Sequence, residues 1–313
     1  MQLRFIAVLI FAGGLSYGQR ENPPLPPVEL LVLGTLQDGG SPHMGCRKSC
    51  CAPFYENPDP NRKVVSLGLL DHVESKAYLM EATPDLPSQM ALLRKEAPFE
   101  ASGAPDGIFL THAHIGHYTG LMFLGREAMN ARGVPVYALP RMLEFLKSNG
   151  PWDQLIRLGN IVLNPLFENV PLQLSGHLEI QPFRVPHRDE YSETAGYRIT
   201  GPSRTALFIP DIDKWDRWEE SLPEILEEVD LAFLDATFYN AAEIGYRDMG
   251  EIPHPFVVES MSLLGNLPLA LRNKVYFIHL NHTNPLLDPK SSESTSVERA
   301  GFRIARIGDR FKL

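Results

Sequence analysis

The feature that most constrains this chain is the stretch LTHAHIGHYTGL at residues 110–121, in which three histidines fall within six positions. The stretch overlaps the short apolar run GIFLT, which is typical of a buried β-strand. His112 and His114 alternate by two beyond that strand, so both side chains can point to the same side. His117 follows where a helix is expected to begin. Because neutral imidazoles bind metals such as zinc and iron, the stretch predicts one wall of a metal site.

Later predicted strands also end in histidine or aspartate. His187 follows HLEIQPFRV, Asp211 follows TALFIP, and VYFIHLNH carries His279 and His282. Strands and helices interleave along the chain, which favours a layered α/β protein with helices covering its sheets. Such folds usually have their active or ligand-binding sites in the loops at strand ends. We therefore expect these side chains to gather at one edge. Strand alternation does not decide the direction of His279, to which we assign only a supporting place.

The hydrophobic patterns and turn signals predict the following strands: 28–34, 64–70, 76–82, 107–111, 132–138, 177–185, 195–200, 205–211, 230–235 and 274–280. Helices are predicted over 86–97, 118–132, 140–150, 218–229 and 254–265. A last strand and turn are expected in 301–313.

This arrangement resembles the metallo-β-lactamase superfamily, whose four-layer αββα sandwich binds one or two metal ions at one sheet edge. The family signature is His-x-His-x-Asp-His, followed by a His, an Asp and a final His at later strand ends. The residues that match it here are His112, His114, His117, His187, Asp211 and His282.

The resemblance implies that a first metal ion is held by three histidines: His112, His114 and His187. A second ion would be held by three further residues, the aspartate bridging both ions: His117, His282 and Asp211. Asp235, at the end of DLAFLD, would orient a ligand histidine, with a plain capping carboxylate as the alternative.

Gly116 stands where the family signature has aspartate. Without that carboxylate the second ion is expected to bind weakly or not at all, and Gly116→Asp is expected to raise the metal content. Two interpretations stay open: a single ion at the three-histidine site, or a substitute carboxylate from another loop. The candidate substitute is Asp38 in LQDGGSP, after the first predicted strand. Because Asp-Gly-Gly is also a turn signal, a turn-forming role is the alternative.

Within the superfamily, the motifs LGTLQDGGSPHMGC, YRDMGEIPH and FIHLNHTNPLL resemble those of the pyrroloquinoline quinone biosynthesis protein B family. That family carries a cysteine-rich metal site early in its chain. Its members lack the first two signature histidines, keep the aspartate, and have asparagine in place of His282. The resemblance therefore implies a relative with a different set of metal ligands.

All three cysteines of the chain lie in HMGCRKSCC, as Cys46, Cys50 and Cys51, with His43 close by. Thiolates and a histidine can hold a structural zinc ion, although the spacing is not that of a standard zinc finger. A disulfide with one spare thiol, or three unlinked thiols, are the alternatives.

The first 18 residues, MQLRFIAVLIFAGGLSYG, have the basic start, short apolar run and small residues of a secretory signal peptide. A Pro-rich linker over 19–27 would then lead into a single domain over 28–313. This predicts a periplasmic or secreted protein without stable membrane insertion. The net charge of −9, with no long Lys or Arg cluster, makes a nucleic-acid partner unfavourable.

The chemistry expected from these patterns is metal-dependent hydrolysis of a small ester, lactone or phosphodiester by a metal-activated water. The expected cofactor is one or two zinc ions, with iron or manganese as alternatives. The catalytic candidates are Asp211, to orient or deprotonate the water, His282, and His254 at the entry of a predicted helix. His254 could instead only mark the helix entry. An iron-dependent oxygenase or oxidoreductase, and a non-catalytic metal-dependent binding protein, are the other functions considered.

Overall fold

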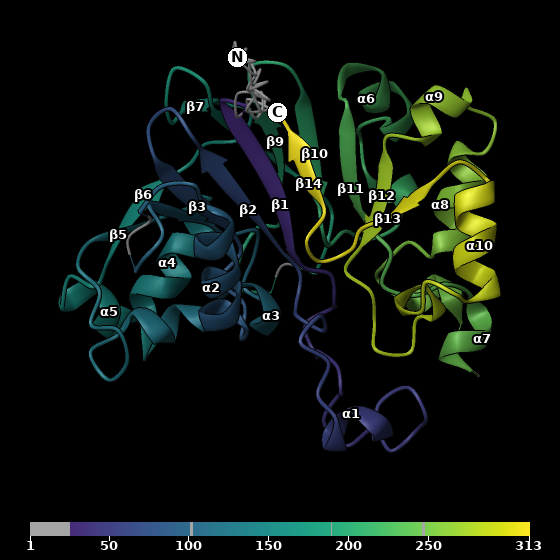
Figure 1. Cartoon of the computed structure of the whole chain (residues 1–313), viewed down its shortest axis with the longest axis horizontal. Coiled ribbons are helices and arrows are strands. Elements are labelled where there is room, and N and C mark those ends of the chain that lie inside the picture. Colours follow the sequence, from purple (N-terminus) through teal and green to yellow (C-terminus); the bar gives the residue numbers. More distant parts are fainter. Residues whose placement is uncertain (1–25, 101–102, 189, 246–247) are drawn as a thin grey trace, which may run out of the picture.

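The computed structural model describes residues 26–100, 103–188, 190–245 and 248–313. The predicted signal peptide and nearly all of the predicted linker lie outside these residues. Two mixed seven-stranded sheets form the centre of the fold (Figure 1). The first sheet has the order β14-β1-β2-β3-β4-β5-β6 and the second the order β13-β12-β11-β10-β9-β8-β7.

The strands of the first sheet are β1 (Val28–Gly34), β2 (Ser66–Asp71), β3 (Lys76–Met80), β4 (Gly107–Phe109), β5 (Val134–Ala138), β6 (Ile161–Pro165) and β14 (Arg310–Lys312). Those of the second are β7 (Leu172–Gln173), β8 (Glu179–Arg184), β9 (Ala195–Thr200), β10 (Thr205–Ile209), β11 (Leu231–Asp235), β12 (Val275–Ile278) and β13 (Arg303–Ile304). The α-helices are α1 (Ala52–Glu56), α2 (Leu86–Glu96), α3 (Ile115–Tyr118), α4 (Pro140–Ser148), α5 (Trp152–Arg157), α6 (Leu222–Glu228), α7 (Ala241–Ile244), α8 (Val257–Leu264), α9 (Leu269–Arg272) and α10 (Ser292–Arg299). Short 3₁₀ turns are η1 (Thr119–Leu124), η2 (Trp215–Arg217), η3 (Met249–Glu251) and η4 (Pro285–Leu287).

The apolar side chains form three layers of core. Side chains of both sheets, such as Leu30, Phe109 and Phe208, fill the space between the sheets. The outer face of the first sheet packs against α2, α4 and α5, and the outer face of the second packs against α6, α8 and α10. These helices flank the two sheets in Figure 1. The four-layer αββα sandwich predicted from the sequence is therefore confirmed.

The strand directions bring the predicted site residues to one edge. β3 and β4 are parallel, and β1 runs the same way because it is separated from β3 by the antiparallel β2. In the second sheet β10, β11 and β12 are parallel, and β8 shares their direction across the antiparallel β9. Within each sheet the carboxyl ends of these strands therefore lie at one edge, where α/β folds usually bind ligands. A bridge between Leu36, after β1, and Leu280, after β12, brings these two edges together.

The predicted helix over 118–132 is wrong. The chain forms only the short α3 and η1 there, residues 125–129 form a bend and turns, and residues 130–132 have no regular structure. Gly120 lies so close to Thr83 that a Cβ atom would stand 2.0 Å from the Thr83 carbonyl oxygen. At Gly125 the backbone is extended, with ψ at 171°, which ends the turn. Close backbone packing therefore overrides the helical spacing of the apolar residues. The helices predicted over 218–229 and 254–265 also begin later, at Leu222 and Val257.

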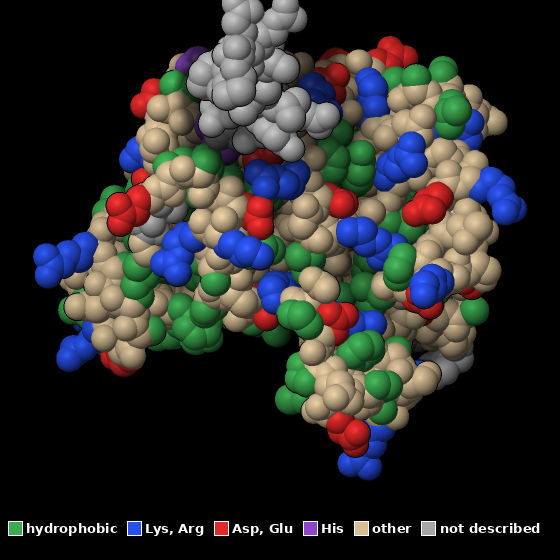
Figure 2. Space-filling view, viewed as in Figure 1, with side chains coloured by type: hydrophobic (Ala, Val, Ile, Leu, Met, Phe, Trp, Pro, Cys, Tyr) green, Lys and Arg blue, Asp and Glu red, His purple; other side chains and the backbone are tan. Residues whose placement is uncertain are grey.

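The distribution of surface charge and the lengths of the helices are relevant to binding nucleic acid and membranes. Lys and Arg side chains are interspersed with Asp and Glu on the face shown in Figure 2. Across the ranges that the structure describes, every helix is too short or too polar to span a lipid bilayer.

Candidate metal centre

Four side chains at strand ends form a first donor group: His112, His114, His187 and Asp211. The Oδ2 atom of Asp211 lies 3.3 Å from Nε2 of His112 and 3.2 Å from Nε2 of His187. Nδ1 of His114 lies 3.3 Å from Nε2 of His187. β4 leads into the two histidines of the HAH stretch, β8 into His187 and β10 into Asp211. The structure thus brings together the residues predicted for the first ion.

A second donor group shares Asp211 with the first and adds Asp38, His117 and His279. Oδ1 of Asp38 lies 3.0 Å from Nε2 of His117 and 3.3 Å from Nε2 of His279. His117 Nε2 is 3.9 Å from Oδ2 of Asp211. The two donor groups are therefore adjacent, and Asp211 lies between them.

The nitrogen and oxygen atoms of the two donor groups are suited to binding a cation. Nε2 of His112 and Oδ1 of Asp211 are buried without a well-directed hydrogen bond among the residues that the structure describes. Buried polar atoms nearly always have a hydrogen-bond partner in folded proteins. Imidazole nitrogens and carboxylate oxygens that converge in this way form the donor set that zinc and related divalent ions bind.

The surroundings of Asp211 favour the ionised form of its carboxylate. Burial by itself would raise the pKa of Asp211, but the surrounding histidines, His187 first, hold that pKa well below its usual range. Burial likewise opposes the charged form of His254, yet Asp235 and Asp211 raise its pKa to about 10. Buried charges persist only when they are paired or bind a metal. Asp211 and His254 therefore each favour the charged form of the other.

The sequence matches the model of the family described as "Beta-lactamase superfamily domain" over residues 76–308. The chain belongs to the metallo-β-lactamase superfamily. It is 26% identical over 306 residues to "Coenzyme PQQ synthesis protein B" of Methylorubrum extorquens (strain PA1). The aligned region covers 90% of this chain and 98% of that protein.

Two solved structures share the fold. Zn²⁺-bound PqqB from Methylobacterium extorquens has a TM-score of 0.74 and 21% identity, covering 91% of this chain and all (100%) of that one. A diphosphatase from the PhnP family has a TM-score of 0.65 and 24% identity, covering 91% and 96%.

Of the two histidines after β12, His279 and not His282 lies in the second donor group. The expectation that His282 completes the second position and takes part in catalysis there is wrong, because its ring lies with the cysteines. Directly after β12 the backbone turns into the left-handed region at His279, with φ at 63°. This turn ends the strand alternation and directs the imidazole towards Asp38. A non-glycine residue in this region is uncommon and is found often at functional sites.

Glu81 is a site residue that the sequence interpretation missed. It follows β3, is fully buried, and also has a positive φ, at 75°. Its Oε1 lies 3.1 Å from Nδ1 of His117, and both of its oxygens accept hydrogen bonds from Thr111. A carboxylate behind a ligand histidine fixes the orientation of the ring. One signal was available: a single acidic residue inside the otherwise uncharged run AYLMEATP.

Asp235 has the supporting position predicted for it. Its Oδ2 lies 2.9 Å from Nδ1 of His254, and its Oδ1 lies 3.7 Å from Nδ1 of His279. It also accepts backbone hydrogen bonds from Ile212 and Thr237, so it fixes local backbone as well. Nδ1 of His254 is 3.1 Å from Oδ1 of Asp211, which places this predicted catalytic residue at the rim of both donor groups.

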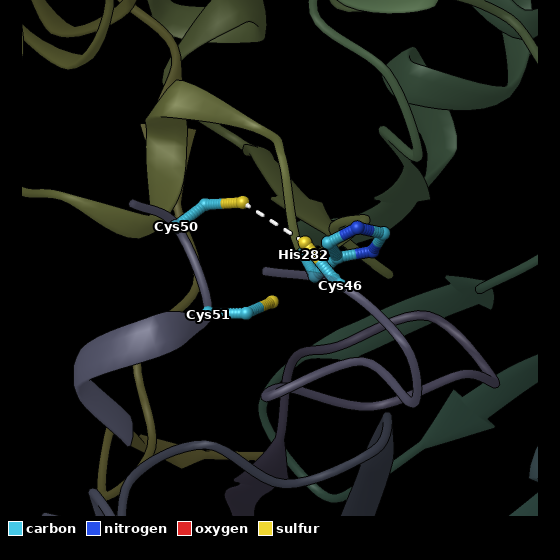
Figure 3. A group of neighbouring side chains, drawn as sticks. All are labelled: Cys46, Cys50, Cys51 and His282. Carbon is cyan, nitrogen blue, oxygen red and sulfur yellow. Dashed lines mark hydrogen bonds between the residues drawn. The ribbon is translucent and has the colours of Figure 1, made fainter. Parts of the chain in front are cut away.

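The cysteine cluster consists of Cys46, Cys50, Cys51 and His282 (Figure 3). The sulfur atoms of Cys46 and Cys50 are 3.7 Å apart, whereas a disulfide requires about 2 Å, so these thiols are not joined. His43, the histidine near the cysteines in sequence, stacks on the ring of His282 at 4.4 Å between centroids. The segment that carries α1 and the cysteines projects beyond the sheets in Figure 1.

A pocket of about 300 Å³ adjoins the centre at His187. Its lining includes Arg141, Arg184 and Arg217, together with acidic residues such as Glu193 and the ring of Trp218. Arg184 is paired with Glu168 and Arg217 with Asp213. The pocket therefore offers a small molecule both charged and aromatic contacts beside the first donor group.

Proposed function

We propose that this protein is a metal-dependent hydrolase that cleaves a small ester or phosphodiester. The observation that carries the proposal is the pair of adjacent donor groups joined by Asp211. Two neighbouring metal positions that share a carboxylate suit hydrolysis, because one site can bind both the attacking and the leaving oxygen.

A bound divalent ion supplies a water whose pKa is near neutrality and polarises the substrate oxygen. The protein supplies the remaining parts. Asp211 lies between the donor groups and can orient that water through its second oxygen. His254, 3.1 Å from the same oxygen, can transfer a proton at the rim of the site. Glu81 and Asp235 hold the rings of His117 and His254 in place.

Zinc is the proposed metal. Histidine nitrogens and carboxylate oxygens are its usual ligands in catalytic sites, and thiolates with one histidine suit a structural site at the cysteine cluster. The solved PqqB structure, which shares the fold, is that of a zinc-bound protein.

A substrate with a phosphoryl group is supported by two observations. The neighbour from the PhnP family is described as a diphosphatase. The pocket beside His187 also contains three arginines, whose guanidinium groups suit phosphate oxygens, although acidic side chains line it too. Acyl substrates such as lactones remain in the same proposed class, because the attack by the activated water is chemically similar.

The test compares metal content and turnover in protein purified without added metal. His112→Ala and His187→Ala are each expected to lose most of the metal at the histidines, together with hydrolysis of bis(4-nitrophenyl) phosphate and 4-nitrophenyl acetate. His177→Ala is the matched control, because His177 lies in the turn before β8, outside the donor groups. If metal content and turnover survive the first two substitutions, the assigned centre is wrong.

A second candidate function is an iron-dependent oxidoreductase, favoured by the 26% identity to a coenzyme PQQ synthesis protein. Histidines and one carboxylate with open positions also suit ferrous iron. Elemental analysis that finds iron at the centre, together with consumption of dioxygen, would support it. Zinc with oxygen-independent cleavage would support the hydrolase. Saturable ligand binding without turnover would support a binding protein.

We also propose that the protein is exported, as its first 18 residues suggest, and acts on a small molecule without a nucleic-acid partner. Amino-terminal sequencing of the mature protein from a periplasmic fraction tests the export. A start at Gln19 is expected, and an intact Met1 would oppose it.

A further inference from the structure

We propose that Asp38 supplies the carboxylate of the second metal position, and that residue 116 is glycine because Asp38 occupies the space of its side chain. This inference rests on the proposed metal site and concerns its second position only. The superfamily signature takes that carboxylate from the helix start after β4. This chain takes it from the loop after β1, on another part of the first sheet.

The close approach of the two residues is the first argument. A Cβ atom placed on Gly116 would stand 2.5 Å from Cα of Asp38 and 2.8 Å from its Cγ and Oδ1. Real Cβ atoms do not approach other heavy atoms so closely, and the nearest atom belongs to the backbone. Gly116 does not have a positive φ, so its backbone conformation does not require glycine. The missing side chain therefore makes room for Asp38.

The direction of the Asp38 carboxylate is the second argument. Its Oδ1 is 3.0 Å from His117 and 3.3 Å from His279, at the ring nitrogens that also lie near Asp211. An aspartate that only shapes a turn accepts hydrogen bonds from nearby backbone N–H groups. Within the described ranges, the hydrogen bonds of the Asp38 side chain go to these two histidines, and the N–H of Gly39 bonds to Gln37. This pattern favours a ligand over a turn-forming role.

The pairing of two segments is the third argument. Leu36 forms a β-bridge with Leu280, so the loop after β1 and the loop after β12 run side by side. The N–H of Leu280 donates to Thr35 at 2.7 Å, and the N–H of Gln37 donates to Leu280 at 2.9 Å. Asp38 and His279 each lie within two residues of this bridge. The bridge between the two sheets thus fixes the positions of Asp38 and His279 relative to each other. With Asp38 as a ligand, the second metal position has as many donors as it would have with the signature aspartate.

The proposal reverses the result expected for Gly116→Asp. The signature alone predicts that Gly116→Asp raises the metal content. In the structure the new side chain would collide with the backbone of Asp38 and displace the carboxylate already there, so the substitution is expected to lower the metal content.

The experiment measures zinc per chain by equilibrium dialysis at fixed free zinc, with elemental analysis, in the full chain. Asp38→Asn keeps the shape of the side chain but removes its charge, and Gly116→Ala adds only the obstructing Cβ. Each is expected to lose about one ion per chain, or to weaken the binding of the second ion by about tenfold or more. The ion at the first donor group is expected to stay.

Two matched controls separate this role from general damage. Asp59→Asn changes an aspartate whose carboxylate accepts a hydrogen bond from the turn N–H of Asn61, and Gly176→Ala adds a Cβ where no atom lies within 4 Å. Both are expected to bind zinc as the unmodified chain does. If Asp38→Asn binds zinc as the unmodified chain does, or if the unmodified chain holds a single ion at the histidines, the inference is overturned while hydrolysis stays open. If no ion binds at the histidines, the proposed function itself fails.

Discussion

Replacing Glu81 with glutamine should weaken the second metal position, because Glu81 orients the ring of His117. The fully buried carboxylate of Glu81 accepts a bond from Thr111 N–H at 3.2 Å with one oxygen. The other oxygen accepts a bond from the Thr111 hydroxyl at 2.6 Å and faces Nδ1 of His117 at 3.1 Å. A proton on Nδ1 leaves the lone pair of Nε2 free for an ion. The carboxylate therefore sets the tautomer that binding requires.

Glutamine cannot replace both oxygens. If its NH₂ group faces Thr111 N–H, two donors meet. If it faces His117, it favours the tautomer with the proton on Nε2, which cannot bind an ion. A hydrogen bond to a charged group contributes about 1.5–3 kcal/mol and a neutral one about 0.5–1.5 kcal/mol. The difference, with the mismatched donor added, corresponds to about 10- to 100-fold weaker binding, the range usual for partners behind a ligand.

The assay is competition with a chromogenic chelator, which gives the zinc dissociation constants of Glu81→Gln and of the unmodified chain. Glu29→Gln is the matched control. Glu29 is also a buried carboxylate but lies near the start of β1, where it pairs with Arg310. Zinc affinities of Glu81→Gln within twofold of the unmodified chain would refute the role of Glu81. An equal loss in Glu29→Gln would show that any buried carboxylate has this effect.

Two further outcomes are expected. Tyr197→Phe removes the hydroxyl that donates to the carbonyl of Leu110 at 2.5 Å in the core, and should lower the free energy of unfolding in urea by about 1–3 kcal/mol; no measurable change would mean that the carbonyl finds another partner. Cys50→Ser should lower the zinc content by about one ion per chain, measured by elemental analysis of protein purified without added metal; an unchanged content would exclude metal at the cysteine cluster.

Local patterns predicted a layered α/β fold whose strand-end residues gather at one edge, and the superfamily resemblance implied the four-layer sandwich and the ligands of the first ion. Apolar runs identify the strands, and in a layered fold the residues after parallel strands meet at one edge. His112, His187 and Asp211 follow directly from this rule. The rule does not depend on the exact conformation of each loop.

The second donor group was predicted only in part, because its geometry depends on backbone conformations that sequence patterns do not reveal. His279 and Glu81 both have positive φ, so strand alternation does not give the direction of their side chains. His282 was matched to the last histidine of the signature, while strand alternation left the direction of His279 undecided. The cysteines were recognised as a cluster, but their fourth partner is distant in sequence, and His43, the nearer histidine, stacks on it instead.

The departure at Gly116 illustrates how a missing ligand can mislead. Judged from the signature alone, the chain has lost a carboxylate and with it a metal position. In the structure the vacated space is filled from the loop after β1, so the position depends on the Leu36–Leu280 bridge instead of on the helix start. The two bridged segments continue into the cysteines on one side and into His282 on the other. A metal ion at the cysteine cluster would therefore clamp the segments that present Asp38 and His279. The Cys50→Ser protein should therefore also bind the ion of the second donor group more weakly. The ion at His112, His114 and His187 should be unaffected, because these three residues do not lie in the bridged segments.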